Sequence, residues 1–174
     1  MRRIRLLVLS VLLLALVVML TAAAEPAAAQ GGNFLLTLLH NNDAESQLIN
    51  AGAGLEDFGG VARFATLVQD LKRSAETGPP PPGHRGVKRG VIMVSSGDNF
   101  LAGPEFNASL EKGVPFYDTI AMDLIGYDAV AIGNHDFDFG PDVLADFISG
   151  YQRTRPPYLS ANLDFSGEPR LQEL

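Results

Sequence analysis

A ten-residue stretch, AIGNHDFDFG (131–140), crowds polar side chains directly behind a short apolar run. Asn134, His135, Asp136 and Asp138 occupy four of five consecutive positions. Polar groups placed so close together cost desolvation energy unless something pairs with them. The stretch is therefore either a solvated loop or a site built around a charge.

Two further polar clusters follow apolar runs of strand length. NND with Glu45 follows the run 33–40, and SSGDN follows the run 90–94. Functional residues of parallel α/β sheets lie at the carboxyl ends of the strands, so the three clusters are expected to converge at one edge. Together they offer several carboxylates, an amide oxygen and one carboxylate able to bridge two cations. Two divalent ions about 3.5–4 Å apart can clamp a phosphoryl oxygen and activate water near neutral pH.

The patterns between these clusters predict the elements that position them. Strands are expected at 33–40, 90–98, 127–133 and 157–162, and helices at 59–73, 116–126 and 140–149. Because the first two strands are apolar runs without alternation, they are predicted to be buried on both faces. The proline-rich segment 77–86 predicts a surface loop. This order is typical of an α/β layer fold with mainly parallel strands.

Apolar residues recur at helical spacing in the expected helices. The apolar face of the first is formed by Val61, Phe64, Ala65, Val68 and Leu71. The apolar face of the second is formed by Tyr117, Ile120, Ala121, Leu124 and Ile125. Gly126 is expected to end the second helix, and Pro141 suits the first position of the third.

Residues 1–30 have the composition of a secretory signal peptide. Three Arg among the first five residues precede the apolar run 6–20, and an Ala-rich segment, 21–30, follows. This arrangement is typical of a signal that is cleaved, here at Ala24 or Ala29. The apolar run is shorter than the roughly 20 residues of a spanning helix. A retained membrane anchor and twin-arginine export are the alternatives, and contact with a membrane is expected only through this segment if it is uncleaved.

Composition excludes several classes of protein. The chain contains no Cys, so it has neither a disulfide framework nor a lipid-anchoring Cys. An exported protein without Cys fits a bacterial envelope better than a small disulfide-rich scaffold. The formal net charge is −7, and because residues 1–30 contain three Arg and one Glu, the remainder carries −9. No nucleic-acid partner is expected for so acidic a domain.

Five blocks of sequence, taken in order, carry a resemblance to a known family. The blocks are LLHNND, GGVARFATL, VSSGDNFLAGP, LIGYDAVAIGNHDFDFG and YLSANL. They resemble the N-terminal part of a 5′-nucleotidase, a family of exported calcineurin-like metallophosphoesterases, over about residues 34–165. The resemblance implies an α/β protein with a β-sandwich flanked by helices, incomplete in this chain. It also implies two divalent ions and hydrolysis of phosphomonoesters, chiefly nucleotides, by attack of a metal-bound hydroxide on phosphorus.

The resemblance also implies roles for individual residues. Asp43 resembles the ligand of the first ion, and Asp98 the carboxylate that bridges both ions. Asn134 resembles a ligand of the second ion through its amide oxygen, and the resemblance implies that Asn134 and His135 contact the substrate. His135 resembles the histidine that stabilises the transferring phosphoryl group or protonates the leaving group. Asp138 resembles the carboxylate that orients this histidine, and an imidazole beside a phosphate and a carboxylate favours its protonated form.

The sequence departs from the family pattern after the first strand. The family usually has Asp-x-His there, whereas this chain has Asp43, Ala44 and Glu45. If Glu45 is a metal ligand, the first site becomes harder and favours manganese, magnesium or calcium over zinc. Alternatively, Glu45 points away and that ligand is lost.

A second departure concerns histidines. The family takes further metal ligands, mostly histidines, from downstream segments, whereas this chain has only His40, His84 and His135. His40 lies in a strand and His84 in the proline-rich loop, so neither is a good substitute. We therefore expect a signal peptide at 1–30 and a truncated N-terminal part of a metallophosphoesterase domain at 31–174, inactive by itself. The two ions are expected to be manganese, magnesium, calcium or zinc.

The sequence thus predicts an exported phosphomonoesterase, a 5′-nucleotidase, located in a bacterial periplasm, on the cell surface or secreted. The alternative is a noncatalytic envelope protein that keeps the fold as a binding module, with Glu45 a sign of lost activity. Asp136 stands where the family often has Glu and is expected to support its loop. Arg63 is expected to be a structural residue of its helix.

Overall fold

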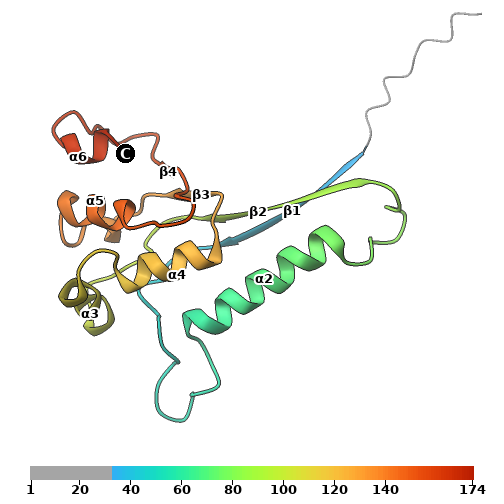
Figure 1. Ribbon diagram of the computed structural model, residues 1–174, viewed down its shortest axis with the longest axis horizontal. Helices are drawn as coiled ribbons and strands as arrows, with labels where there is room; N and C mark the ends of the chain where they lie inside the picture. Colours follow the sequence, from blue (N-terminus) through green and yellow to red (C-terminus); the bar gives the residue numbers. More distant parts are fainter. Residues whose placement is uncertain (1–32) are drawn as a thin grey trace, which may run out of the picture. The chain divides into compact units, whose positions relative to one another are not determined.

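The computed structural model describes residues 33–174 (Figure 1), and the expected signal peptide at 1–30 lies outside the described residues. The elements are, in chain order, β1 (Phe34–Asn41), α2 (Val61–Thr77), β2 (Lys88–Ser95), α3 (Pro104–Lys112), α4 (Tyr117–Ile125), β3 (Ala129–Ala131), the 3₁₀ turn η1 (His135–Phe137), α5 (Pro141–Ser149), β4 (Tyr158–Leu159) and α6 (Pro169–Gln172). Within this described part, no helix has the length and apolar character needed to cross a membrane.

The four strands form one parallel sheet in the order β1-β2-β3-β4. Because parallel crossovers are right-handed, sequential strands place their connecting helices on one side of the sheet. Figure 1 shows α2 and α4 together on the same side of β1 and β2. The predicted mixed α/β class with parallel strands is confirmed. Residues 33–174 form this sheet alone, so they do not supply a second layer of a sandwich.

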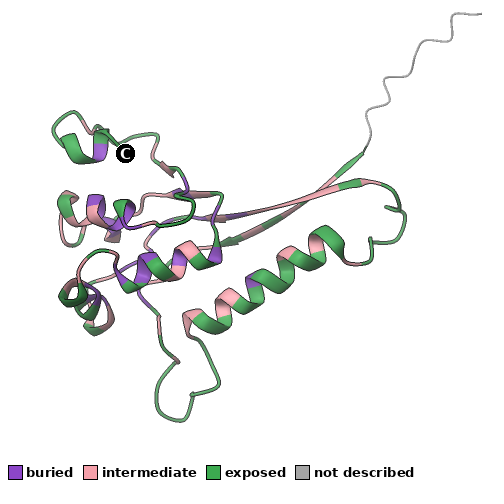
Figure 2. Ribbon diagram, in the orientation of Figure 1, coloured by how far each residue is buried: buried purple, intermediate pink, exposed green. Residues whose placement is uncertain are grey.

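The core lies where α3, α4 and α5 pack beneath the carboxyl ends of the strands, as the buried residues in Figure 2 show. Its centre is a group of aromatic rings. Phe100 and Phe106 stack at 4.4 Å between centroids, and Phe147 lies 4.8 Å from Phe100. All three side chains are buried. Each such burial contributes about 1.5–3 kcal/mol, so this group anchors the loop after β2 to the helices.

The prediction that β1 is buried on both faces is wrong. Phe34, Leu36 and Leu38 are 59%, 52% and 56% exposed, and they alternate with half-buried residues along the strand. The reason is topological, because β1 is an edge strand and the helices cover only one face of the sheet. The residues facing the helices are shielded, whereas every second residue is left open.

The predicted apolar face of α4 is also wrong in part. The residues buried from this helix are Asp118, Thr119, Met122 and Ile125, whereas Tyr117, Ile120 and Leu124 are exposed. Tertiary hydrogen bonds explain the difference. The Asp118 carboxylate accepts a hydrogen bond from Ser109 Oγ (2.5 Å), and Thr119 Oγ1 donates to the carbonyl of Phe147 (3.1 Å). These partners satisfy polar groups that helical spacing alone assigns to solvent.

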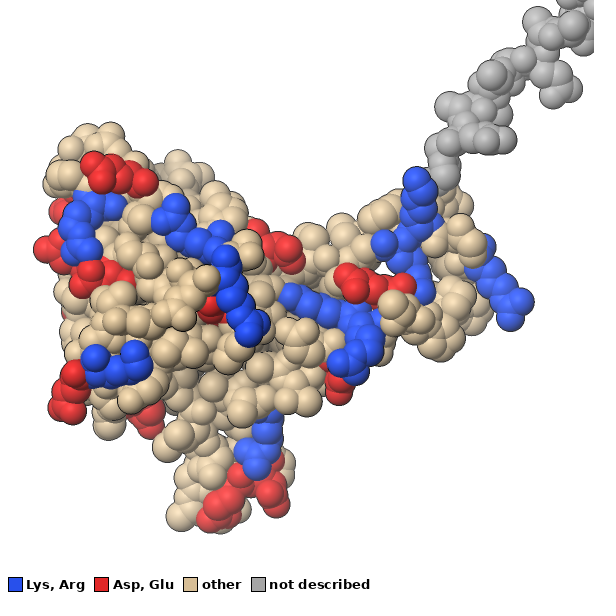
Figure 3. Space-filling model, in the orientation of Figure 1, with Lys and Arg blue, Asp and Glu red and all other residues tan. Residues whose placement is uncertain are grey.

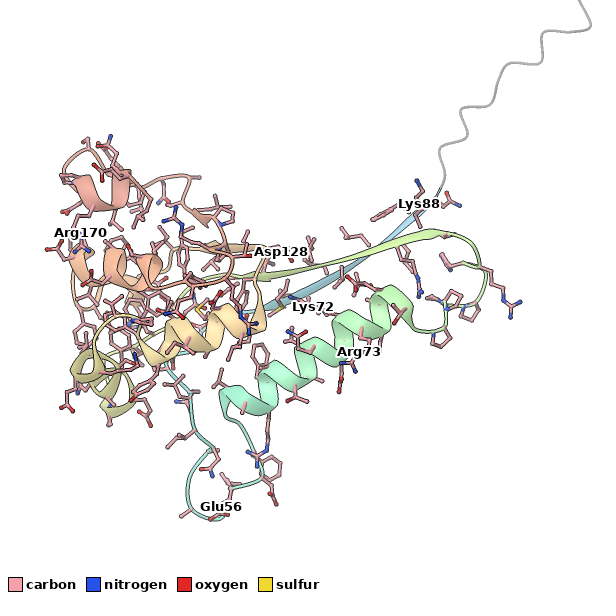
Figure 4. The ribbon with its side chains drawn as sticks, in the orientation of Figure 1. Glu56, Lys72, Arg73, Lys88, Asp128 and Arg170 are labelled. Atoms are coloured by element: carbon pink, nitrogen blue, oxygen red, sulfur yellow. The ribbon has the colours of Figure 1, made fainter. Side chains whose placement is uncertain are left out.

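Two side chains of α2 fix its position against α4. Lys72 Nζ donates to the carbonyl oxygen of Ile125 (3.1 Å), and Gln69 Nε2 donates to that of Leu124 (3.2 Å). Figure 4 shows Lys72 on the side of α2 toward the end of α4. A cation at the C-terminus of a helix satisfies free carbonyl groups and complements the helix dipole. Leu71, which was assigned to the apolar face of this helix, is 42% exposed.

Candidate functional site

The loops after β2 and β3 approach each other at two glycines. A Cβ at Gly97 would lie 2.6 Å from the backbone nitrogen of Gly133, and Gly97 has a φ of 101°. A Cβ at Gly133 would lie 2.2 Å from Asp98 Oδ1. Neither position tolerates a side chain without movement, which explains the glycine that precedes each polar cluster.

Backbone hydrogen bonds also join the loop after β1 to the loop after β2. They run from Asp43 N–H to Gly97 O (3.2 Å), from Glu45 N–H to Asp98 O (3.1 Å) and from Ser46 N–H to Asn99 O (3.2 Å). Asp43, Glu45 and Asp98 all have positive φ values, of 49°, 46° and 53°. Such backbone conformations are costly for residues other than glycine and cluster at functional sites. The structure therefore brings the first two predicted clusters together.

The third cluster is joined to the second through side chains. Asp98 Oδ1 accepts a hydrogen bond from the backbone N–H of His135 (2.8 Å). Asn134 is the residue directly before His135 and is exposed at the start of η1. The backbone carbonyl of Asn134 accepts a hydrogen bond from the N–H of Phe137 (3.3 Å). The predicted site residues thus lie on three loops at one edge of the sheet.

Asp136 joins the loop after β2, which contains Gly97, to the loop after β3, which contains Gly133. Its side chain is 1% exposed. Oδ2 accepts hydrogen bonds from the backbone N–H groups of Gly133 (2.8 Å) and Asp98 (3.3 Å), and Oδ1 accepts one from Asn99 (3.3 Å). Burial raises the pKa of the Asp136 carboxyl to about 6, although the three backbone donors oppose this shift. The expected supporting role of Asp136 therefore extends to both loops.

His135 and Asp138 form a pair across η1. His135 Nδ1 lies 3.2 Å and 3.1 Å from the two carboxylate oxygens of Asp138. Asp138 Oδ2 also accepts the backbone N–H of Ala102 (3.3 Å), which fixes the carboxylate. The hydrogen bond to Asp138 raises the pKa of His135, and the charges of Asp138, Asp98 and Glu45 raise it further. Because Nδ1 is engaged, Nε2 is the ring atom left to act on a substrate.

Among residues 33–174, no group of three or more His, Cys, Asp or Glu side chains is placed to hold a metal ion. His84 lies in the loop between α2 and β2, with Nδ1 beside the carbonyl of Pro82 (3.0 Å). The site offers oxygen donors held by strained backbone, and a histidine–aspartate pair beside them.

Sequence reasoning missed the roles of two neighbouring residues. Ser46 and Asn99 follow Glu45 and Asp98 directly, and both are 3% exposed. Asn99 Oδ1 accepts a hydrogen bond from Ser95 Oγ (2.8 Å). A polar residue placed immediately after a predicted ligand is the only signal that the sequence carries for them.

The chain is similar in sequence to nucleotide phosphoesterases and 5′-nucleotidases. The chain is 32% identical over 149 residues to the trifunctional nucleotide phosphoesterase YfkN of Bacillus subtilis, a match covering 79% of this chain and 8% of that protein. It is 31% identical over 136 residues to the snake venom 5′-nucleotidase of Naja atra, covering 75% and 22%. The chain is thus related in sequence to 5′-nucleotidases and nucleotide phosphoesterases.

Solved structures of these 5′-nucleotidase and phosphoesterase relatives share the fold. The 5′-nucleotidase precursor of Thermus thermophilus matches with a TM-score of 0.57 at 33% identity, over 79% of this chain and 24% of that one. The calcineurin-like phosphoesterase YfkN of Bacillus subtilis matches with a TM-score of 0.54 at 21% identity, over 71% and 36%. No protein-family model matches the chain. The chain spans less than a quarter of the length of the curated relatives named above.

Proposed function

We propose that the protein is a metal-dependent phosphomonoester hydrolase that acts on nucleotides as a 5′-nucleotidase. The observation that carries the proposal is the contact of Asp98 with the backbone of His135, whose imidazole is held by Asp138. This arrangement places a carboxylate next to a histidine whose pKa is raised. The relatives support the substrate class, since those named are nucleotide phosphoesterases and 5′-nucleotidases.

The donor chemistry of the loops fits part of a divalent-ion site. Asp43, Asp98 and Asn134 would hold ions through oxygen, the donor that manganese, magnesium and calcium prefer. The glycine at position 133 lets its loop approach Asp98 closely, since a Cβ there would lie 2.2 Å from Asp98 Oδ1. A bound pair of divalent ions would neutralise phosphate charge and lower the pKa of water. Among residues 33–174, no group of three or more His, Cys, Asp or Glu side chains completes such a site. In this proposal, the 174-residue chain is inactive by itself.

His135 supplies the proton chemistry in this proposal. Asp138 holds Nδ1, so the proton on Nε2 is the one that can pass to the leaving-group oxygen. The raised pKa keeps the imidazolium populated at a higher pH than for a free histidine. A nucleoside leaving as an alcohol needs such an acid, because an alkoxide is a poor leaving group.

The surface fits a small-molecule substrate better than a nucleic acid. On the face shown in Figure 3, Lys and Arg side chains alternate with acidic ones over most of the surface and gather toward the end nearest the grey trace. The net charge of −7 also repels a polyanion. Localised divalent ions would be needed to attract a nucleotide phosphate to so acidic a protein.

Export is part of the same proposal. Residues 1–30 would direct the protein out of the cytoplasm and be removed at Ala24 or Ala29. N-terminal sequencing of the protein from the envelope or culture fluid is the test. An intact Met1 on a membrane-embedded product contradicts cleavage and supports the retained anchor.

The activity is tested by phosphate release from nucleoside monophosphates. The native protein carrying this sequence is stripped with a chelator and reconstituted with each divalent metal in turn. Asp98→Asn should abolish both activity and metal binding, whereas His135→Ala should retain metal and slow turnover by about 10²–10⁴-fold. Loss of metal from His135→Ala would contradict its role as an acid. Metal-replete protein that releases no phosphate would favour the noncatalytic binding module.

Glu45 decides the metal preference in this proposal. As a ligand it adds negative charge and replaces a nitrogen donor, so manganese, magnesium or calcium should support activity and zinc should give little. Glu45→His should shift the preference toward zinc, and Glu45→Ala should weaken metal affinity by about tenfold or more. Identical metal profiles for the native protein and Glu45→Ala would show that Glu45 is not a ligand.

A further inference from the structure

Asp118 is a buried carboxylate that takes no part in the proposed chemistry. It lies in the first turn of α4 and is 3% exposed. No ion pair within residues 33–174 includes it, so no cation compensates for its burial. Aspartate is almost never this buried unless it is paired or hydrogen-bonded, because loss of water disfavours the charged form. The hydrogen-bond partners of Asp118 therefore indicate its role.

Two serine hydroxyl groups donate hydrogen bonds to this carboxylate from different parts of the chain. Ser109 in α3 donates through Oγ to Asp118 Oδ2 (2.5 Å). Ser46 in the loop after β1 is the second donor. Burial raises the pKa of Asp118, and the hydrogen bonds from Ser109 and, less strongly, from Ser46 lower it. Ser46 Oγ and Asp118 Oδ1 are both buried and have no other partner in the described part of the chain, so each of these atoms depends on the other.

Ser46 belongs to the strained segment that carries two candidate metal ligands. It has a φ of 57°, and Asp43 and Glu45 before it have φ values of 49° and 46°. Residues other than glycine keep such a conformation only where their surroundings hold it. The backbone of Ser46 is held by Asn99, whose carbonyl accepts its N–H (3.2 Å). The contact with Asp118 adds a side-chain restraint to this backbone restraint at the end of the segment.

We propose that Asp118 is a positioning residue for the candidate metal site, which holds Ser46 and thereby fixes the backbone that presents Asp43 and Glu45. Through its two serine partners, the carboxylate connects α3 and α4 to the loop after β1. Without it, the Ser46 hydroxyl would lose its partner in the interior, and the segment would be free to leave its costly backbone conformation. The claim about metal binding rests on the proposed function, whereas the claim about the loop does not.

Ser109 provides a matched control for Ser46. Each serine donates one hydroxyl hydrogen bond to the same carboxylate, and the two residues are 0% and 3% exposed. Ser109→Ala therefore disturbs the buried carboxylate and α3, whereas Ser46→Ala releases the loop. A merely structural Asp118 would make the two variants alike, whereas a positioning Asp118 makes them differ at residues 43–48.

The first test is amide hydrogen exchange of the metal-free native protein, measured by mass spectrometry on a peptide covering residues 43–48. The backbone N–H groups of Glu45 and Ser46 donate to the loop after β2, which protects them. Ser46→Ala and Asp118→Ala should each accelerate their exchange by about tenfold or more, whereas Ser109→Ala should leave it near the native rate. Native protection in Ser46→Ala, or equal acceleration in Ser109→Ala, would overturn the proposal. If Asp118→Ala does not fold, the two serine variants decide the outcome.

The second test is manganese binding, measured by calorimetry on the native protein after removal of metal. Ser46→Ala should weaken manganese affinity by about tenfold, as loss of a group that orients metal ligands commonly does, and Ser109→Ala should not. Accelerated exchange with unchanged manganese affinity in Ser46→Ala would overturn the link to the metal site. A native protein that binds none of manganese, magnesium and calcium would instead refute the proposed metal dependence, and the exchange comparison would still decide the role of Asp118.

Discussion

The backbone N–H of His135 donates a hydrogen bond of 2.8 Å to Oδ1 of Asp98. The carboxylate that follows β2 therefore fixes the start of the loop that follows β3. One carboxylate oxygen is committed to the protein, which leaves Oδ2 of Asp98 for any ligand. The contact depends on the close approach of Gly133, whose position admits no side chain beside Asp98.

Gly133→Ala is expected to destabilise the fold by about 1–3 kcal/mol, the usual effect of forcing an extra methyl group into a filled space. The added Cβ would stand 2.2 Å from Asp98 Oδ1, so the carboxylate or the loop must move. Gly167→Ala is the matched control, because its Cβ meets no atom within 4 Å. Chemical denaturation of the three proteins measures the difference. Equal stability of Gly133→Ala and Gly167→Ala would contradict the close packing described.

Asp136→Leu removes the acceptor of three backbone N–H groups. Those of Gly133, Asp98 and Asn99 would lose their partner in the interior. We expect a loss of about 2–4 kcal/mol in the free energy of unfolding. Asp70→Leu, at an exposed position of α2, should change it by less than about 1 kcal/mol. A loss in Asp136→Leu no larger than this control would show that water replaces the carboxylate.

The same carboxyl predicts a pH dependence of stability. Burial raises the pKa of Asp136 from 3.8 to about 6, so the folded protein holds this proton more tightly than the unfolded chain. The stabilisation is complete below pH 3.8 and is lost as the pH rises through about 6, a change of at most about 3 kcal/mol. Asp136→Asn should remove this slope in denaturation curves measured from pH 4 to 7. An unchanged slope would assign it to other groups.

Part of this arrangement could be predicted from the sequence. Short apolar runs predicted each strand of the sheet, and apolar residues at helical spacing predicted the helices between them. Burial of one face of an element imposes these patterns on the sequence directly. The meeting of the three polar clusters followed from the parallel order alone. The helix α3 was missed, although Pro104 at its first turn and Gly113 after its end are signals for such a helix.

What failed depends on partners distant in sequence. Asp118 and Thr119 lie on the buried side of α4 because each has a hydrogen-bond partner there. Ser109 donates to Asp118, and Thr119 donates to the carbonyl of Phe147. The spacing of residues along the helix predicts neither partner. The exposure of Leu36 on β1 depends on which face of the sheet the helices cover. The sequence also did not predict that Asp136 contacts both the loop after β2 and the loop after β3, because these loops meet only in the folded chain.

Lys72→Ala should destabilise the contact between α2 and α4. Its ammonium group donates to the carbonyls of Ile125 and Gly126, where α4 ends. Loss of a cation at this end of a helix is expected to lower the free energy of unfolding by about 0.5–1.5 kcal/mol. Arg73→Ala is a close control, since the exposed Arg73 pairs with Asp70 on its own helix. Similar values for the two variants would mean that Lys72 is solvated in solution.

Asp138→Asn should lower the pKa of His135. The carboxylate bonded to Nδ1 is the largest cause that raises this pKa, followed by the charges of Asp98 and Glu45. The raised pKa means that this pair stabilises the fold below the pKa of an unfolded histidine, and that the effect disappears as the pH rises through the folded pKa. An NMR titration of the imidazole signal of His135 measures the pKa directly. Asp142→Asn on α5 is the control, and it should leave the titration of His135 unchanged. If Asp138→Asn also leaves it unchanged, the pair does not form in solution, and the proposed acid loses the group that orients it.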